Sequence, residues 1–260
     1  MSERLHDRVR YEVKDRIAYI SLDRPERLNA FDGAMYDGVN EAMDRFAEDD
    51  AAWVAIIQAT SDRAFTAGAD VKALDEKAKR GVFTALGGLK LDTEMVTDKP
   101  VIAAVHGHCV GEGVNLALAC DCIFADSSAR FTISEVRIGT NPVDIPLKLA
   151  RRLPYALAFS FLTPGDGKDA AWMQAAGLAQ VSAAGEARAD AAAFARRIVE
   201  ECGPLAVRAQ KATLWEASFA SEEEARTLGN ERRAMIRRSE DYAEGRLAFL
   251  EKRQPRFQGR

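Results

Sequence analysis

The sequence predicts an α/β fold with a C-terminal helical region, and three observations support this. Strongly apolar strand patterns occur within the first 125 residues, and segments with helical spacing separate several of them. From about Asp169 onward the patterns are almost entirely helical. A shift from alternating strands and helices to helices alone favours an α/β core followed by a helical region. A chain of 260 residues is long enough to bury a sizeable core.

The first strands surround one helix. Residues 9–13 alternate apolar and polar, which is typical of a strand with one buried face. Residues 17–22 and 54–59 are more continuously apolar and indicate buried strands. Residues 34–46 have helical spacing and suit a crossover helix, with apolar side chains at Met35, Val39, Met43 and Phe46.

The rest of the chain continues the pattern. Residues 71–96 predict a mixed, mainly helical stretch, interrupted by Gly81 and by Gly87 and Gly88, and therefore a candidate for mobility near a site. A strand at 101–105, a helix at 114–120 and a strand at 122–125 follow. The clearest later helices are 190–200, 205–217 and 222–238. The tail from Ser239 carries apolar side chains at Leu247, Phe249 and Leu250, so it is either a solvated final helix or a surface that packs on a neighbouring subunit.

Composition excludes several classes of protein. The net charge of −4 gives no general attraction to nucleic acid or to an anionic membrane. No apolar run reaches the roughly 18–20 residues that span a bilayer, and the N-terminus lacks the apolar stretch of a signal peptide. The four cysteines form no disulfide pattern, which favours the reducing cytoplasm. No complementary Cys/His pair completes a metal site with His106 and His108, so we expect no metal.

A glycine-rich turn at 107–113 joins the strand at 101–105 to an apolar helix. Backbone N–H groups at a helix N-terminus have no partner within the helix, so they can hold a developing negative charge. A second turn of small residues, 67–70, follows the strand at 54–59. Small residues permit a backbone to approach a ligand closely.

Three blocks in one order resemble the enoyl-CoA hydratase/isomerase family, also called the crotonase family. They are LDRPERLNAF at 22–31, FTAGAD at 65–70 and KPVIAAVHGHCVGEGVNLALACDCIFADSSARFTISE at 99–135. The resemblance implies a crotonase-like spiral of ββα units. It also implies an acyl-CoA-binding core at 1–195 and a helical trimerisation region at 196–260, assembled as a homotrimer or homohexamer.

The resemblance implies a binding site for an acyl-CoA thioester. Two backbone N–H groups, those of Ala69 and Glu112, would polarise the thioester carbonyl. The family usually has glycine at position 112, but a backbone N–H survives the change, and the added carboxylate should point away from the thioester oxygen. The implied coenzyme A contacts are Arg24, Arg27, Leu28, Ala67, Asp70 and Lys72.

The catalytic residues implied by the resemblance are Glu135 and Asn115. Hydratases of the family use two glutamates, and Glu135 matches the second. Asn115 stands where the first usually lies, and an amide orients water but takes no proton at neutral pH. Taken without the resemblance, Glu135 is a partly exposed loop acid.

Asp144 has two interpretations. It lies close to the position at which dienoyl-CoA isomerases carry an extra aspartate, so it is a candidate for the missing second carboxylate. It also suits the N-cap of a helix that begins near Pro146.

The resulting prediction is an enzyme that stabilises the enolate of an acyl-CoA thioester. Hydration of a 2-enoyl-CoA to a 3-hydroxyacyl-CoA is the first expectation. The alternatives are isomerisation of an enoyl-CoA or dienoyl-CoA double bond, or an acyl-CoA-binding protein with weak catalysis. No cofactor is expected, since coenzyme A is part of the substrate, and the expected partners include neither nucleic acid nor a membrane.

Overall fold

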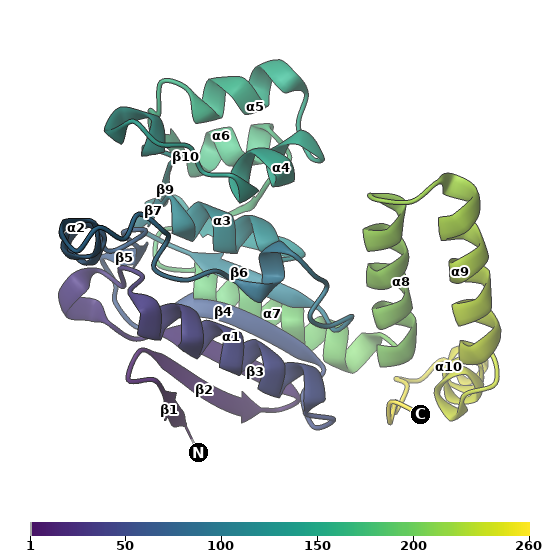
Figure 1. The fold of residues 1–260 in the computed structure, drawn as a ribbon. Coiled ribbons are helices and arrows are strands. Elements are labelled where there is room, and N and C mark those ends of the chain that lie inside the picture. Colours follow the sequence, from purple (N-terminus) through teal and green to yellow (C-terminus); the bar gives the residue numbers. More distant parts are fainter. Residues whose placement is uncertain (1) are drawn as a thin grey trace.

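Two β-sheets organise the computed structural model, which describes residues 2–260 (Figure 1). Strands β3 to β11 of the larger sheet run parallel, whereas β1 and β2 pair antiparallel at its edge. Its order is β1 (Glu3–Leu5), β2 (Val9–Lys14), β3 (Ile17–Leu22), β4 (Val54–Ala59), β6 (Val101–Val105), β8 (Cys122–Asp126) and β11 (Gln180–Ser182).

The smaller sheet shows how the chain spirals. Its order is β10 (Lys168–Asp169), β9 (Arg130–Thr132), β7 (His108–Val110) and β5 (Ala64–Thr66). Each turn of the chain places one strand in the larger sheet and the next in the smaller sheet, as β4 with β5, β6 with β7, and β8 with β9. Helices α2 (Val71–Lys79) and α3 (Glu112–Ala119) follow the first two of these pairs. The expected ββα spiral is therefore confirmed.

Successive side chains along a strand point to opposite faces of the sheet. Because the strands of the larger sheet carry apolar side chains on both faces, helices cover both. Helix α7 (Ala187–Glu201) lies on one face, where Ala191 and Ala195 pack against Ile56 and Ile102. Helices α1 (Gly33–Glu48) and α3 lie on the other side (Figure 1). Asp32 caps α1 by accepting a hydrogen bond from the Met35 N–H at 2.9 Å.

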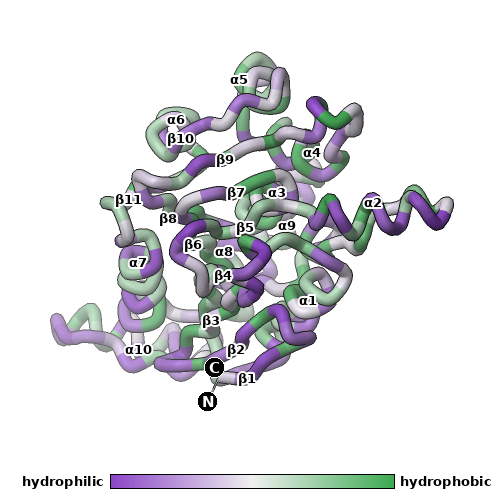
Figure 2. The backbone as a smooth tube through the Cα atoms, turned by 90° about the vertical axis from the view of Figure 1, so that its left-hand side faces the viewer, coloured by the Kyte–Doolittle hydropathy of each residue, from purple (hydrophilic) through white to green (hydrophobic). Residues whose placement is uncertain are grey.

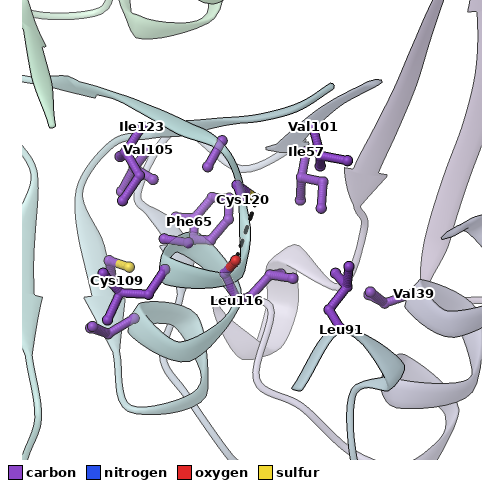
Figure 3. Packing of buried hydrophobic residues seen from close by; sticks show 14 of the residues in the cluster. Val39, Ile57, Phe65, Leu91, Val101, Val105, Cys109, Leu116, Cys120 and Ile123 are labelled. Carbon is purple, nitrogen blue, oxygen red and sulfur yellow. Dashed lines mark hydrogen bonds between the residues drawn. The ribbon is translucent and has the colours of Figure 1, made fainter. Parts of the chain in front are cut away.

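The main core lies between α1, α3 and the two sheets. Figure 3 shows Phe65 of the smaller sheet close to the Leu116 turn of α3, with Val105 and Ile123 of the larger sheet nearby. The Cys120 thiol donates a hydrogen bond to the Leu116 carbonyl at 3.3 Å. This packing fixes α3, and with it the turn that precedes it.

Two further groups of helices lie outside this core. Helices α4 (Asp144–Ala150), α5 (Tyr155–Leu162) and α6 (Ala170–Ala175) gather at one end of the molecule (Figure 1). Helices α8 (Pro204–Ala217), α9 (Glu222–Ile236) and α10 (Glu240–Glu251), here called the helical arm, stand beside the body. Ser221 and Glu224 form a reciprocal capping box at the start of α9.

Most predicted elements are present, with ends that differ by up to three residues from the predicted ones, but one segment was predicted wrongly. Residues 71–96 are not mainly helical, since they contain only α2 and the 3-10 helix η2 (Lys90–Asp92). Helix α2 buries no residue and projects from the body (Figure 2), and the glycines after it provide no helical continuation. Helix α3 begins at Glu112 rather than at 114, so Gly113, the last glycine of the turn, lies inside the helix.

The predicted division at 195/196 falls inside α7. Ile198 and Val199, beyond that point, still pack against the larger sheet. The division into two regions stays a prediction. In the structure, the helical arm begins after α7.

Candidate active site

The turn before α3 leads to a backbone N–H that has no partner within the helix. Gly111 is the N-cap of α3 and has a φ of +48°, a conformation that favours glycine. The Gly111 carbonyl accepts the first intrahelical bond, from the Asn115 N–H at 3.0 Å. Glu112 is therefore the first residue of the helix, and its own N–H has no partner along the helix axis.

A second N–H comes from the turn after β5. Ala69 forms a parallel bridge with Phe31, in which the Phe31 N–H donates to Gly68 and the Asp70 N–H donates to Phe31. In this pairing the Ala69 N–H points away from Phe31. Gly68 has a φ of +86°, and a Cβ there would lie 2.8 Å from the Val110 carbonyl oxygen. The two turns are thus in close contact, which places Ala69 beside the start of α3.

The Glu135 carboxyl lies against the start of α3. Glu135 opens the 3-10 helix η3 (Glu135–Ile138), and its Oε1 would be only 2.5 Å from a Cβ built on Gly111. Its Oε2 is buried without a hydrogen-bond partner among residues 2–260. Burial raises the pKa of Glu135, so the carboxyl holds a proton more readily than an exposed glutamate does.

The Asn115 side chain lies at the centre of a buried polar cluster. Its Nδ2 donates to Glu112 Oε1 at 2.9 Å and to the two oxygens of Asp92 at 3.0 and 3.1 Å. Its Oδ1 accepts a bond from Lys148 Nζ at 2.6 Å. Lys148 also pairs with Asp92 at 2.5 Å, and the two side chains are only 9% and 8% exposed. We call Tyr36, Asp92, Glu112, Asn115 and Lys148 the α3 cluster.

The Glu112 side chain joins this cluster to α1. Tyr36 donates its hydroxyl to Glu112 Oε2 at 3.0 Å, while Oε1 accepts from Asn115. Burial is the main reason that the pKa of Glu112 is raised, and the nearby Asp92 adds to the effect. The carboxyl is therefore directed toward Tyr36 and Asn115.

The residues expected to contact coenzyme A differ in their surroundings. Arg24 is largely buried and pairs with Asp32 at 3.3 Å and with Asp70 at 2.8 Å. Asp70 also caps α2 by accepting from Ala73. Arg24 and Asp70 thus hold the second turn together.

The other four expected contacts lie around the same turn. Arg27 and Lys72 are exposed, and Leu28 is half-buried. The half-buried Ala67 donates its N–H to the Leu28 carbonyl at 2.9 Å. A role for these residues in binding coenzyme A stays a prediction.

Asp144 is the first residue of α4, and the N-cap position belongs to Val143. The prediction that Asp144 caps this helix was therefore wrong, because the helix begins two residues earlier than Pro146. The side chain is half-buried. Its proposed role as a second carboxylate stays a prediction.

The sequence reasoning missed Tyr36, Asp92 and Lys148. A lysine inside the apolar pattern of DIPLKLA was the one available signal, because a buried ammonium requires an acidic partner. Asp92 lies in the segment 71–96, whose sequence pattern did not indicate where its side chains would lie. Tyr36 was not singled out because it lies on the apolar face of α1, where it resembles an ordinary core residue.

Within residues 2–260, no group of three or more His, Cys, Asp or Glu side chains is arranged to hold a metal ion. His106 instead is buried, with its Nε2 at 2.5 Å from the Ser61 carbonyl. None of the helices in the same range is long and apolar enough to cross a membrane.

Two turns with backbone N–H groups, close to the Glu135 carboxyl whose pKa burial raises, form a candidate site for a carbonyl that becomes negatively charged. Residues 12–260 match the model of the enoyl-CoA hydratase/isomerase family, and the chain belongs to this family.

Named relatives agree with this assignment. The chain is 36% identical to carnitinyl-CoA dehydratase of Proteus mirabilis, over 100% of both chains. It is 30% identical to (E)-benzylidenesuccinyl-CoA hydratase of Thauera aromatica, over 96% of this chain and 99% of the relative. The crystal structure of an enoyl-CoA hydratase from Mycobacterium tuberculosis H37Rv superposes with a TM-score of 0.86 at 32% identity, covering 97% of this chain and 99% of that one.

Proposed function

We propose that the protein catalyses the reversible addition of water to a 2-enoyl-CoA, giving a 3-hydroxyacyl-CoA. One observation carries the proposal. The Glu135 carboxyl lies against Gly111, one residue before the Glu112 N–H, and the Ala69 turn packs on the same segment. A thioester oxygen bound between the two N–H groups would place the adjacent carbon atoms near a carboxyl that exchanges protons.

The chemistry follows from this arrangement. When water attacks the β-carbon, the electrons of the double bond move toward the thioester and its oxygen becomes negative. The Ala69 and Glu112 N–H groups stabilise that charge, an effect commonly about 3 kcal/mol for one donor. Glu135 delivers a proton to the α-carbon, and its raised pKa suits a group that must carry a proton.

The relatives support water chemistry. One is named a dehydratase and two are named hydratases, and all act on a CoA ester by name. Their acyl groups differ, so they support the reaction type and leave the acyl group of this enzyme to experiment.

Double-bond isomerisation is a second candidate, and one observation favours it. The Asn115 amide cannot take a proton, and both of its ends are engaged within the α3 cluster. If Glu135 is the only group that moves protons, it can shuttle one between two carbon atoms of the acyl chain without adding water.

The proposed enzyme needs no cofactor besides the coenzyme A of its substrate and acts in the cytoplasm as a homotrimer or homohexamer. Large apolar side chains exposed on the helical arm support assembly. Leu214 is 73% exposed, Met235 65%, and Phe249 83%. Such side chains are typical of surfaces that pack on another chain.

Mass spectrometry of CoA esters incubated with the protein in heavy water tests the function. The panel contains 2-enoyl-, 3-enoyl- and dienoyl-CoA esters. A gain of one water by the 2-enoyl esters is expected. Deuterium incorporation with a shifted double bond and no added water would identify an isomerase instead. Binding of the esters without any change in them would contradict both and indicate a binding protein.

A further inference from the structure

The α3 cluster contains a carboxyl for which the reaction above has not yet accounted. We propose that Glu112 supplies the second carboxyl of this reaction through its side chain, in addition to the oxyanion contact of its backbone N–H. The inference rests on the hydration proposed above.

Position 112 shares a helix face with position 115. Residues three apart in a helix are neighbours, and Glu112 Oε1 lies 2.9 Å from Asn115 Nδ2. The carboxyl of Glu112 therefore stands within hydrogen-bond distance of the amide. The amide orients its neighbours, whereas the carboxyl can exchange a proton.

Asp92 also touches Asn115, but its electrostatic surroundings differ. The Lys148 ammonium contacts Asp92 at 2.5 Å, so that carboxylate has a buried positive partner. Glu112 has neutral hydrogen-bond partners, the Tyr36 hydroxyl and the Asn115 amide. Of the two acids, Glu112 is the one that can gain or lose a proton without breaking an ion pair.

The location of Glu112 suits the substrate. Its backbone N–H would bind the thioester oxygen, so its side chain begins beside the reacting part of the acyl group. Glu135 approaches the preceding residue, Gly111, from η3. The start of α3 thus has two carboxyls, which come from different segments of the chain.

The groups that face Glu112 all bear on its titration. They are Tyr36 from α1, Asp92 from η2, Asn115 from its own helix and Lys148 from α4. Glu135 lies farther away, on the other side of Gly111. Burial raises the pKa of Glu112, which makes its ionised form a stronger base than an exposed glutamate.

The proposed step is balanced as follows. The water oxygen forms a bond to the β-carbon while Glu112, ionised, takes the proton that the water loses. The double bond breaks, its electrons move to the α-carbon, and protonated Glu135 delivers a proton there. Glu112 ends protonated and Glu135 ionised, and exchange with solvent restores both.

The test separates water addition from α-proton exchange. The first assay is hydration of a short unbranched 2-enoyl-CoA. The second is deuterium incorporation at the α-carbon of the corresponding saturated acyl-CoA, which needs Glu135 and the oxyanion contacts alone. The variants are Glu112→Gln and Tyr36→Phe. Glu223→Gln serves as the control, because it removes an exposed glutamate from the first turn of α9.

We expect Glu112→Gln to lower the kcat of hydration by about 100-fold or more and to leave exchange within about threefold. The Tyr36 hydroxyl favours ionised Glu112, so Tyr36→Phe should move one limb of the hydration pH profile to higher pH. Glu223→Gln should change neither assay. A purely structural role for Glu112 would not move that limb.

Three results would overturn the inference. The first is hydration by Glu112→Gln within about threefold of the wild type, and the second is an equal loss of hydration and exchange. The third is a Tyr36→Phe pH profile identical to that of the wild type. Absence of hydration by the wild-type protein would refute the proposed function as well, and is a separate observation.

Discussion

Asn115 donates a hydrogen bond to Glu112 one turn earlier on α3, with 2.9 Å between Nδ2 and Oε1. This contact ties the residue whose backbone N–H would polarise the substrate to the residue at which the family's hydratases usually carry an acid. The amide cannot titrate, but it orients a carboxyl that can. The carboxyls of Glu112 and Glu135 therefore both lie at the start of α3, even though position 115 carries none.

Gly111 is the first position at which a small change should be damaging. A methyl group there would lie 2.5 Å from Glu135 Oε1, and the φ of +48° disfavours any side chain. We expect Gly111→Ala to lower kcat/KM by about 100-fold or more, because both the turn and the carboxyl must shift. Steady-state hydration kinetics measure this.

Gly88→Ala is the matched control, since no atom of residues 2–260 lies within 4 Å of a Cβ at Gly88. It should keep kcat/KM within about twofold. A Gly111→Ala enzyme as active as the Gly88→Ala enzyme would contradict the placement of Glu135.

The ion pair between Lys148 and Asp92 should matter for stability. Lys148→Met leaves the Asp92 carboxylate and the Asn115 carbonyl buried without their cationic partner. We expect a loss of about 3–5 kcal/mol in the free energy of unfolding, measured by urea denaturation. In the double variant Lys148→Met/Asp92→Leu the loss should be smaller, because no charge remains unpaired. A double variant less stable than Lys148→Met would contradict this.

Glu112 should make stability depend on pH. Burial raises its pKa in the folded protein, so the stability it contributes is fully present below its unfolded pKa, about 4.3, and is lost as the pH rises through the folded value. The stability of Glu112→Gln relative to the wild type should therefore increase as the pH is raised from about 4. Urea denaturation at several pH values measures this, and Glu223→Gln should show no such trend. A constant difference across the range would be inconsistent with a buried Glu112 of raised pKa.

Arg24 should stabilise the second turn, residues 67–70. Its pairs with Asp32 and Asp70 are largely buried, so Arg24→Gln should reduce the free energy of unfolding by about 2 kcal/mol. Arg27→Gln and Lys72→Gln remove exposed charges, so they should weaken binding of coenzyme A with little effect on stability. Calorimetric binding and thermal unfolding of the three variants distinguish the roles. Arg24→Gln with normal stability would contradict the assignment.

Sequence patterns predicted the parts of the fold that depend on local periodicity. The strands at 17–22, 54–59 and 101–105 were predicted with their observed bounds, because each is a short apolar run between polar turns. The smaller sheet was missed because β5, β7 and β9 are three residues long, too short for alternation to show. Their pairing depends on contacts between distant segments of the chain.

The candidate site was likewise predicted only in part. The resemblance to the family led to Ala69, Glu112 and Glu135, and the structure brings their segments together. Apart from the lysine within DIPLKLA, nothing in the sequence indicated the α3 cluster, because Asp92 and Lys148 meet Asn115 only after η2 and α4 have packed against α3. The interpretation of Asp144 as an N-cap was wrong because local sequence does not determine at which residue a short helix begins.

The central claim is that Glu135 moves the proton at the α-carbon. Its most direct test is α-carbon deuterium exchange of a saturated acyl-CoA by Glu135→Gln, with the binding of the ester measured in parallel. We predict that the exchange rate falls by about 100- to 10,000-fold while the dissociation constant changes by less than about threefold. Exchange at the wild-type rate would contradict the account and assign the proton transfer to another group.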